Sequence, residues 1–248
     1  MPRLVFFLLI SVALASLQPA QAQKIIEKSV NLAKGQRVYL NLKHATNIRI
    51  RAGAAGRLAL RAAVDINQGK ANEALLLSQE QTAEELTFIT KLDKERLQNG
   101  QMANCPDGGA HYGDNYVTRN KKGNYGVDKS DGHSSYSACV RVDYDITVPA
   151  DVTLRVSTIS GDIDIVGLTG DIDAKSISGF VDVTWPGQAA EVSFKTITGE
   201  VYTDQDVAFS NHKPNPIVGY QLHGSLGSKG PLVKLESISN DVYFRKRK

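Results

Sequence analysis

The segment SGDIDIVGLTGDIDAKSISGFVDV, residues 160–183, repeats one short pattern three times. Gly161, Gly170 and Gly179 fall nine residues apart, and aliphatic residues alternate with acidic or polar ones after each glycine. Alternation with a period of two indicates a strand with one buried face. The alternation of aliphatic and polar residues shifts by one residue before each new repeat, which predicts that the chain turns a corner there. Two nine-residue sides then make one coil of about 18 residues in a β-solenoid.

The alternation also assigns side chains to the inside or the outside of the coil. Glycine weakens a strand unless the backbone geometry requires it, so we expect the inward glycines to lie where a narrow coil leaves no room for a side chain. The predicted inward set is Ile159, Gly161, Ile163, Ile165, Leu168, Gly170, Ile172, Ala174, Ile177, Gly179, Val181 and Val183. The predicted outward acids are Asp162, Asp164, Asp171, Asp173 and Asp182.

The pattern continues downstream as FKTITGEVYT and, with Asn240 in place of glycine, as LESISNDVYF. Asparagine tolerates a positive φ better than most residues, which we take as the reason for its presence there. Stacked coils predict aliphatic columns such as Ile163, Val181, Val201 and Val242. Residues 204–230 are predicted to form a looser coil with extra loop, and Trp185 is predicted to fill the core or a corner at WPG.

The part of the chain before residue 98 is also strand-like. RVYLNL, NIRIRA and LALRAAVDI alternate and are separated by turns such as AKG and AGAAG. We expect a short helical turn near residues 72–75, then a strand, with TAEE as the turn before LTFITKL. The segment VRVDYDITV is a further strand, which Pro149 ends because proline cannot donate to a sheet.

The first 22 residues, MPRLVFFLLISVALASLQPAQA, have the pattern of a secretory signal peptide. The apolar run is too short to cross a bilayer, which needs about 20 residues. We therefore expect an exported chain that starts at Gln23, has no transmembrane segment, and lies in the periplasm or at the cell surface.

The charge balance disfavours nucleic acid as a partner. The chain has 29 basic and 26 acidic residues. Arg3 and the four terminal cations Arg245, Lys246, Arg247 and Lys248 account for five of the basic ones, which leaves 24 against 26. A nucleic-acid-binding protein is expected to have a basic face. The terminal cations are interpreted as a solvated end that keeps the last strand from pairing onward.

Residues 99–138 differ from the rest because they contain no Leu, Ile or Phe but seven Gly and four Tyr. Cys105 lies near the start of this segment and Cys139 directly follows it, and in an exported chain a disulfide between them is the expected state. The predicted organisation is thus a β-rich part over 23–98, a disulfide-closed loop over 99–139 and repeats over 140–248. Tyrosine and glycine are typical of recognition loops. The candidate ligand-binding residues are His111, Tyr112, Asp114, Tyr116, Tyr125, His133 and Tyr136.

The text DITVPADVTLRVSTISGDIDIVGLTGDIDAKSISGFVDV, together with GQRVYLNLKHATNIRI, resembles the bacterial putative-adhesin family of β-strand-repeat proteins of unknown function. The shared motif is a Val-Pro before a strand, followed by [ST]-Ile-[ST]-Gly-x-[IV]. The resemblance implies an all-β, right-handed parallel β-solenoid that is exported. It offers no catalytic residues.

The outward acids suggest two chemical alternatives, a calcium site and an enzyme. Calcium-binding β-rolls have several glycines per nine residues and an Asp in the turn, unlike this repeat. A polysaccharide-active β-helix enzyme would use neighbouring carboxylates such as Asp164 and Asp182 as acid and base. The main interpretation is a non-enzymatic adhesin or scaffold without cofactor or metal, with envelope glycans or proteins as partners. The enzyme stays the alternative.

Overall fold

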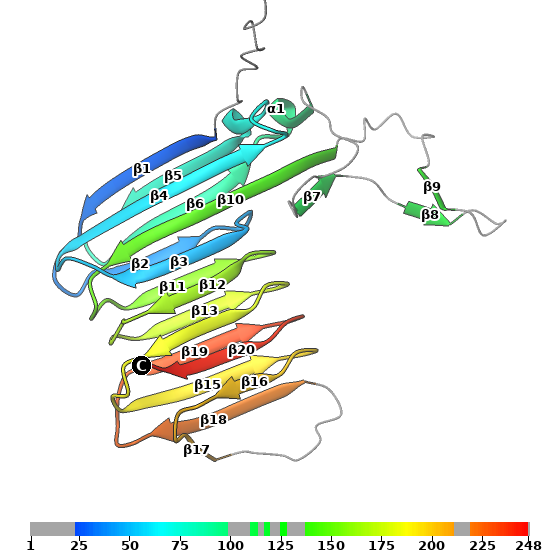
Figure 1. Ribbon diagram of the computed structural model, residues 1–248. Helices are drawn as coiled ribbons and strands as arrows, with labels where there is room; N and C mark the ends of the chain where they lie inside the picture. Colours follow the sequence, from blue (N-terminus) through cyan, green and yellow to red (C-terminus); the bar gives the residue numbers. More distant parts are fainter. Residues whose placement is uncertain are drawn as a thin grey trace, which may run out of the picture.

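The computed structural model describes residues 23–98, 110–113, 117–119, 125–127, 137–210 and 219–247. The predicted signal peptide, residues 1–22, lies outside these ranges. The described chain is nearly all β, with two large sheets of nine strands each (Figure 1). The helical elements are the short η1 (Asn72–Ala74) and α1 (Lys94–Gln98). The predicted all-β class is therefore confirmed.

All strands of sheet A except β7 (Ala110–Gly113) pair side by side in one linear order. β7 pairs with β10 beside that order. The order is β1 (Lys24–Asn31), β4 (Arg57–Ile66), β10 (Ser137–Val148), β3 (Asn47–Ala52), β12 (Asp162–Val166), β14 (Val181–Trp185), β20 (Val242–Lys246) and β16 (Val201–Thr203).

Sheet B faces sheet A across the core. Its order is β17 (Ala208–Phe209), β18 (Tyr220–Leu226), β15 (Ala190–Thr196), β19 (Leu232–Ser237), β13 (Ile172–Ser176), β11 (Leu154–Thr158), β2 (Arg37–Asn41), β6 (Glu85–Leu92) and β5 (Leu75–Gln81). A separate hairpin joins β8 (Val117–Arg119) to β9 (Tyr125–Val127).

Strands of the repeat alternate between the two sheets and pair in parallel at the predicted spacing. Ile163 of β12 pairs with Val181 of β14, and Leu154 of β11 pairs with Ile172 of β13, so each offset is 18 residues. We call one sheet B strand with the sheet A strand that follows it a rung. The side chains of Ile163 and Val181 are fully buried, as their parity predicts.

The rungs do not stack in chain order. β19 pairs with both β13 and β15, and β20 pairs with both β14 and β16, so the last rung inserts between two earlier ones (Figure 1). The predicted column therefore runs Ile163, Val181, Val242 and then Val201. Residues 220–226 do not form a parallel coil, since β18 pairs antiparallel with β15. Because β20 has a neighbour on each side, the prediction that the terminal cations protect a free edge is wrong.

The corners differ from the predicted parity. Ile159 and Ile177, predicted to point inward, are 37% and 38% exposed. The Ser or Thr before each isoleucine is buried instead, and these residues are Thr158, Ser176, Thr196 and Ser237. The Ser176 hydroxyl donates to the carbonyl of Gly161 at 2.8 Å and accepts from the Gly179 N–H at 2.9 Å. The same pair of bonds recurs at Ser237 and Thr196, so buried hydroxyls link successive rungs.

The repeat glycines are required by close backbone approach. A Cβ on Gly179 would lie 2.0 Å from the carbonyl oxygen of Gly161, and one on Gly170 would lie 2.3 Å from that of Val152. This confirms the expected lack of room. Neither glycine has a positive φ, and Asn240 does not have one either, so the explanation given for that asparagine is wrong. Its side-chain oxygen instead accepts a hydrogen bond from the Asp241 N–H at 2.8 Å.

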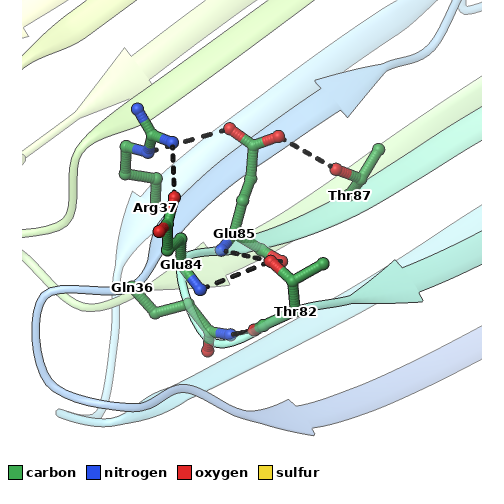
Figure 2. Close-up of polar contacts among 6 residues, drawn as sticks. All are labelled: Gln36, Arg37, Thr82, Glu84, Glu85 and Thr87. Carbon is green, nitrogen blue, oxygen red and sulfur yellow. Dashed lines mark hydrogen bonds and ion pairs between the residues drawn. The ribbon is translucent and has the colours of Figure 1, made fainter.

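The turn between β5 and β6 follows the prediction for TAEE. The Thr82 N–H donates to the Glu85 carbonyl at 2.9 Å, and the Thr82 hydroxyl accepts from the N–H groups of Glu84 and Glu85 at 3.3 and 3.1 Å. Figure 2 shows this turn with Arg37 of β2 beside it, 3.8 and 3.9 Å from the two glutamates. The expected helical turn near residues 72–75 is also present, as η1. The first hairpin of sheet B is thus held by local backbone and threonine bonds.

On the outer face of sheet B, Glu236 lies between two lysines. Its carboxylate is 3.1 Å from Lys175 and 3.3 Å from Lys195 on the flanking strands. Burial favours the neutral carboxyl, but the two lysine hydrogen bonds and charges outweigh it and lower the pKa of Glu236. One inserted acid thus joins the three strands β13, β19 and β15.

This arrangement predicts a loss of stability in acid. A lowered folded-state pKa stabilises the fold above the ordinary Glu value of 4.5, and this contribution is lost as pH falls through the lowered pKa. We expect Glu236→Gln to have a lower urea midpoint than the wild type at pH 7 and to approach it at pH 3. Equal midpoints of the two proteins at pH 7 would show that the lysine contacts contribute nothing.

Candidate functional site

The arginine-lined hollow lies on the outer face of sheet A, over β1, β4, β10 and β3, and has a volume of about 490 Å³. Its charged lining residues are Glu27, Lys28, Arg49, Arg51, Arg57, Arg61 and Asp145, and its uncharged polar ones are Ser29 and Thr147. These residues come from chain segments up to 120 positions apart, which the sheet brings together.

Strand alternation aims these side chains outward. Ile48 and Ile50 of β3 are fully buried, so Arg49 and Arg51 between and after them face solvent. Leu58 and Leu60 of β4 are buried in the same way, which turns Arg57, Ala59 and Arg61 outward.

The register explains why the surface is hollow there. Ser29, Ala59 and Thr147 are paired neighbours across β1, β4 and β10, so three small side chains lie in one row. Thr147 is paired on its other side with Arg51. The adjacent row contains Arg61, Asp145 and Arg49. Small residues therefore form the floor and long arginines form the walls.

The cations of the hollow are weakly paired. Arg49 and Arg61 share one carboxylate, Asp145, at 3.8 and 3.9 Å, and Arg51 lies 3.8 Å from Asp164 on β12. The Arg57 Nε donates to the Ser29 hydroxyl at 2.7 Å. Arg49, Arg51 and Arg61 are each about half exposed. Exposed pairs at such distances contribute little to stability, so the guanidinium groups remain available to a ligand.

A second hollow, on sheet B, provides a contrast. It measures about 260 Å³ and its charged lining residues are Arg37, Glu85, Arg155, Asp171, Asp173 and Lys234. This lining has equal numbers of cationic and acidic side chains, three of each. Lys234 lies 3.4 Å from Asp173, and the Arg155 guanidinium lies over the Tyr39 ring at 4.9 Å. The excess of positive charge is therefore a property of the hollow on sheet A and not of the sheet B hollow.

Three of the outward acids of the repeat, Asp162, Asp164 and Asp182, lie on β12 and β14 of sheet A, on the same face as the arginine-lined hollow. The other two, Asp171 and Asp173, lie at the hollow on sheet B. Asp164 and Asp182 are paired neighbours on β12 and β14. Burial raises the pKa of the Asp182 carboxyl, Arg245 at 2.9 Å opposes this, and Asp164 adds to the rise. Asp162 accepts a hydrogen bond from the Phe180 N–H. Among the described residues no group of three His, Cys, Asp or Glu side chains could hold a metal ion.

Aromatic residues occupy the other end of the same face. Tyr202 of β16 stacks on Tyr243 of β20 with ring centroids 5.2 Å apart, and Phe180 meets Tyr243 edge-on. The Tyr202 hydroxyl donates to Glu200 at 2.7 Å, and this hydrogen bond raises the pKa of Tyr202 to about 12. The outer face of sheet A therefore changes from charged to aromatic along the stack.

The predicted recognition loop is only partly described. His111 and Tyr112 lie on β7, which pairs with β10, and Tyr125 lies on β9. Asp114, Tyr116, His133 and Tyr136 lie outside the described residues, so their proposed role in binding stays a prediction.

The predicted disulfide also stays a prediction. Cys139 is buried at the start of β10, opposite His111, and Cys105 lies outside the described residues. Thiol titration of the denatured, unreduced chain is expected to find no free cysteine, because the expected export would expose both thiols to an oxidising compartment. Two titratable thiols would refute the pairing.

Comparison with known proteins found distantly similar solved structures. No family model matches the chain, and no curated protein matches it. A crystal structure of a putative cell adhesion protein from Clostridium sporogenes ATCC 15579 is similar with a TM-score of 0.49 and 10% identity, over 90% of this chain and 100% of that one. A putative adhesin from Bacteroides fragilis NCTC 9343 is similar with a TM-score of 0.23 and 9% identity, over 92% of this chain and 99% of that one.

Membership of the adhesin-like family therefore stays a prediction, and the evidence on function comes from this chain's own residues. Within the described residues, no helix is long and apolar enough to span a membrane.

Proposed function

We propose that this chain is an exported, adhesin-like binding module of the bacterial envelope, built as a right-handed β-solenoid and acting without catalysis. The observation that carries the proposal is the arginine-lined hollow. Long strands with buried aliphatic neighbours fix the backbone from which its side chains project, so a ligand meets a strand arrangement that is already formed. Binding to a preorganised surface avoids much of the entropy cost of ordering it.

The location follows from the signal-peptide pattern of residues 1–22. An exported chain meets the polysaccharides and proteins of the envelope, which are the partners we propose. The stacked rungs supply a stiff support, because every inner strand is bonded on both sides. Such a support suits a scaffold or an adhesin that has to present one face.

The enzyme alternative depends on Asp164 and Asp182. A glycoside hydrolase uses two neighbouring carboxyl groups, and the one that acts as general acid has a raised pKa. In this chain Arg245 lies 2.9 Å from Asp182 and Arg51 lies 3.8 Å from Asp164. Each of the two carboxylates thus already has a cationic partner in the fold, so we propose that the pair is not catalytic.

The test is an array of envelope glycans and proteins probed with the full exported chain, followed by recovery of each bound ligand. We expect retention of a ligand whose length is unchanged after prolonged incubation. Shortened glycans, with cleavage lost in Asp164→Asn or Asp182→Asn, would establish the enzyme instead. Absence of any retained ligand would refute the binding function.

A further inference from the structure

The arginine-lined hollow has a large local excess of positive charge. Four arginine side chains line it against two carboxylates. Lys28 is not counted, because it pairs with the buried Leu60 and its side chain lies on the inner side of β1. The chain without its first 22 and its last four residues has more acids than bases. The hollow on sheet B, with three of each sign, shows that this imbalance is local. A concave surface with one sign of charge concentrates ligands of the opposite sign.

The spacing of the cations suits an anion with several oxygens. Arg51 on β3 and Arg57 and Arg61 on β4 stand on opposite sides of β10, two strand spacings apart, which is about 9.6 Å. Long arginine side chains from the two strands can converge on a group that lies above Thr147. Arginine presents its donors in a planar fork that matches carboxylate or sulfate oxygens.

The rest of the lining suits a sugar that carries such an anion. Ser29 and Thr147 offer hydroxyls at the floor, and Glu27 and Asp145 offer carboxylates that accept hydrogen bonds from sugar hydroxyls. The volume of about 490 Å³ is within the range of small-ligand sites, so it admits a few sugar units.

We infer that the arginine-lined hollow binds an acidic polysaccharide, with one anionic sugar unit held over Ala59 and Thr147 between the arginines of β3 and β4. This inference rests on the proposed binding function and specifies its ligand class. A nucleic acid fits less well, because an exported chain with a net acidic body lacks the wider basic face that a phosphate backbone needs.

The test compares the full chain with two matched double variants, using a galacturonate oligomer, a neutral galactose oligomer of equal length and inorganic phosphate as probes. Arg51→Gln with Arg57→Gln removes two charges from the arginine-lined hollow. Arg37→Gln with Arg155→Gln removes the same charge from the hollow on sheet B. Ala59→Phe fills the floor of the first hollow without changing its charge. Urea midpoints close to that of the wild type establish that each variant is folded.

The acidic oligomer is expected to bind wild type and to bind more weakly as salt is raised. Affinity should fall at least tenfold in the Arg51/Arg57 variant and in Ala59→Phe, and stay within twofold in the Arg37/Arg155 variant. The inference is overturned by equal losses in both double variants, by equal binding of the neutral oligomer, or by phosphate binding as tightly as the sugar. Should the chain retain only neutral glycans or proteins, this inference fails while the proposed binding function stands.

Discussion

Replacement of Gly179 by valine is expected to lower the free energy of unfolding by about 3 kcal/mol or more. The obstacle is main chain, since any Cβ at this position would lie 2.0 Å from the carbonyl oxygen of Gly161 and 2.8 Å from the N–H of Asp162. A side chain could rotate away, but this carbonyl cannot, because it accepts the Ser176 hydroxyl bond. The two rungs would have to separate, and the corner bonds between them would be lost.

Denaturant melts measure this effect. Ser178→Val is the matched control, because it adds the same side chain one position away at an exposed site and should change stability by no more than about 0.5 kcal/mol. Gly179→Ala should already be clearly destabilised, since the clash begins at the Cβ. If Gly179→Val and Ser178→Val unfold at the same midpoint, the close stacking of the corners is wrong.

Replacement of Trp185 by alanine is expected to cost about 3 to 5 kcal/mol, the range for large buried aromatic side chains. Trp185 is fully buried at the end of β14 and packs on Phe244, with ring centroids 6.2 Å apart. Phe244 in turn packs on Phe194 of sheet B at 5.3 Å. The substitution therefore opens a cavity where the inserted last rung meets both sheets, and the Trp185 indole N–H bond to the Gln188 carbonyl is lost.

Calorimetric or urea unfolding of Trp185→Ala, beside Tyr202→Ala, provides the measurement. Tyr202 is 46% exposed on the edge strand β16, so its removal should cost less than about 1 kcal/mol. A Trp185→Ala protein as stable as the wild type would mean that this tryptophan is not in the core.

Parity along single strands could be predicted from the sequence. Ile163, Ile165, Val181 and Val183 are buried as the alternation indicates, because a strand has only two faces. The corners could not be predicted in this way. Ile177 was assigned to the core by counting, but the chain turns there, and the smaller Ser176 is buried because its hydroxyl satisfies backbone groups of two rungs.

The order in which the rungs stack on one another could not be predicted from the sequence either. Spacing along the chain predicts the length of a coil, but it does not state which coils become neighbours. Residues 232–246 repeat the motif as well as residues 190–203 do, and either segment could follow β13 and β14. The structure places the later one there, so Lys234 meets Asp173 and Arg245 meets Asp182.

The arginine-lined hollow was missed for a related reason. Its residues lie in EKS, NIRIRA, RLALR and DIT, where each arginine has the pattern of an ordinary outward residue in an alternating strand. The signal was present as arginines spaced two apart in NIRIRA and four apart in RLALR. It becomes a site only when β10, which begins 71 residues after the end of β4, inserts between β3 and β4.

Arginine footprinting tests most directly the central claim that this chain binds through the outer face of sheet A. The chain is treated with an arginine-specific dicarbonyl reagent, with and without saturating envelope polysaccharide, and modification is read at each residue by mass spectrometry. The account predicts protection of Arg49, Arg51, Arg57 and Arg61, with Arg37 and Arg155 modified equally in both samples. Protection of Arg37 and Arg155 with continued modification of Arg51 and Arg57 would contradict it.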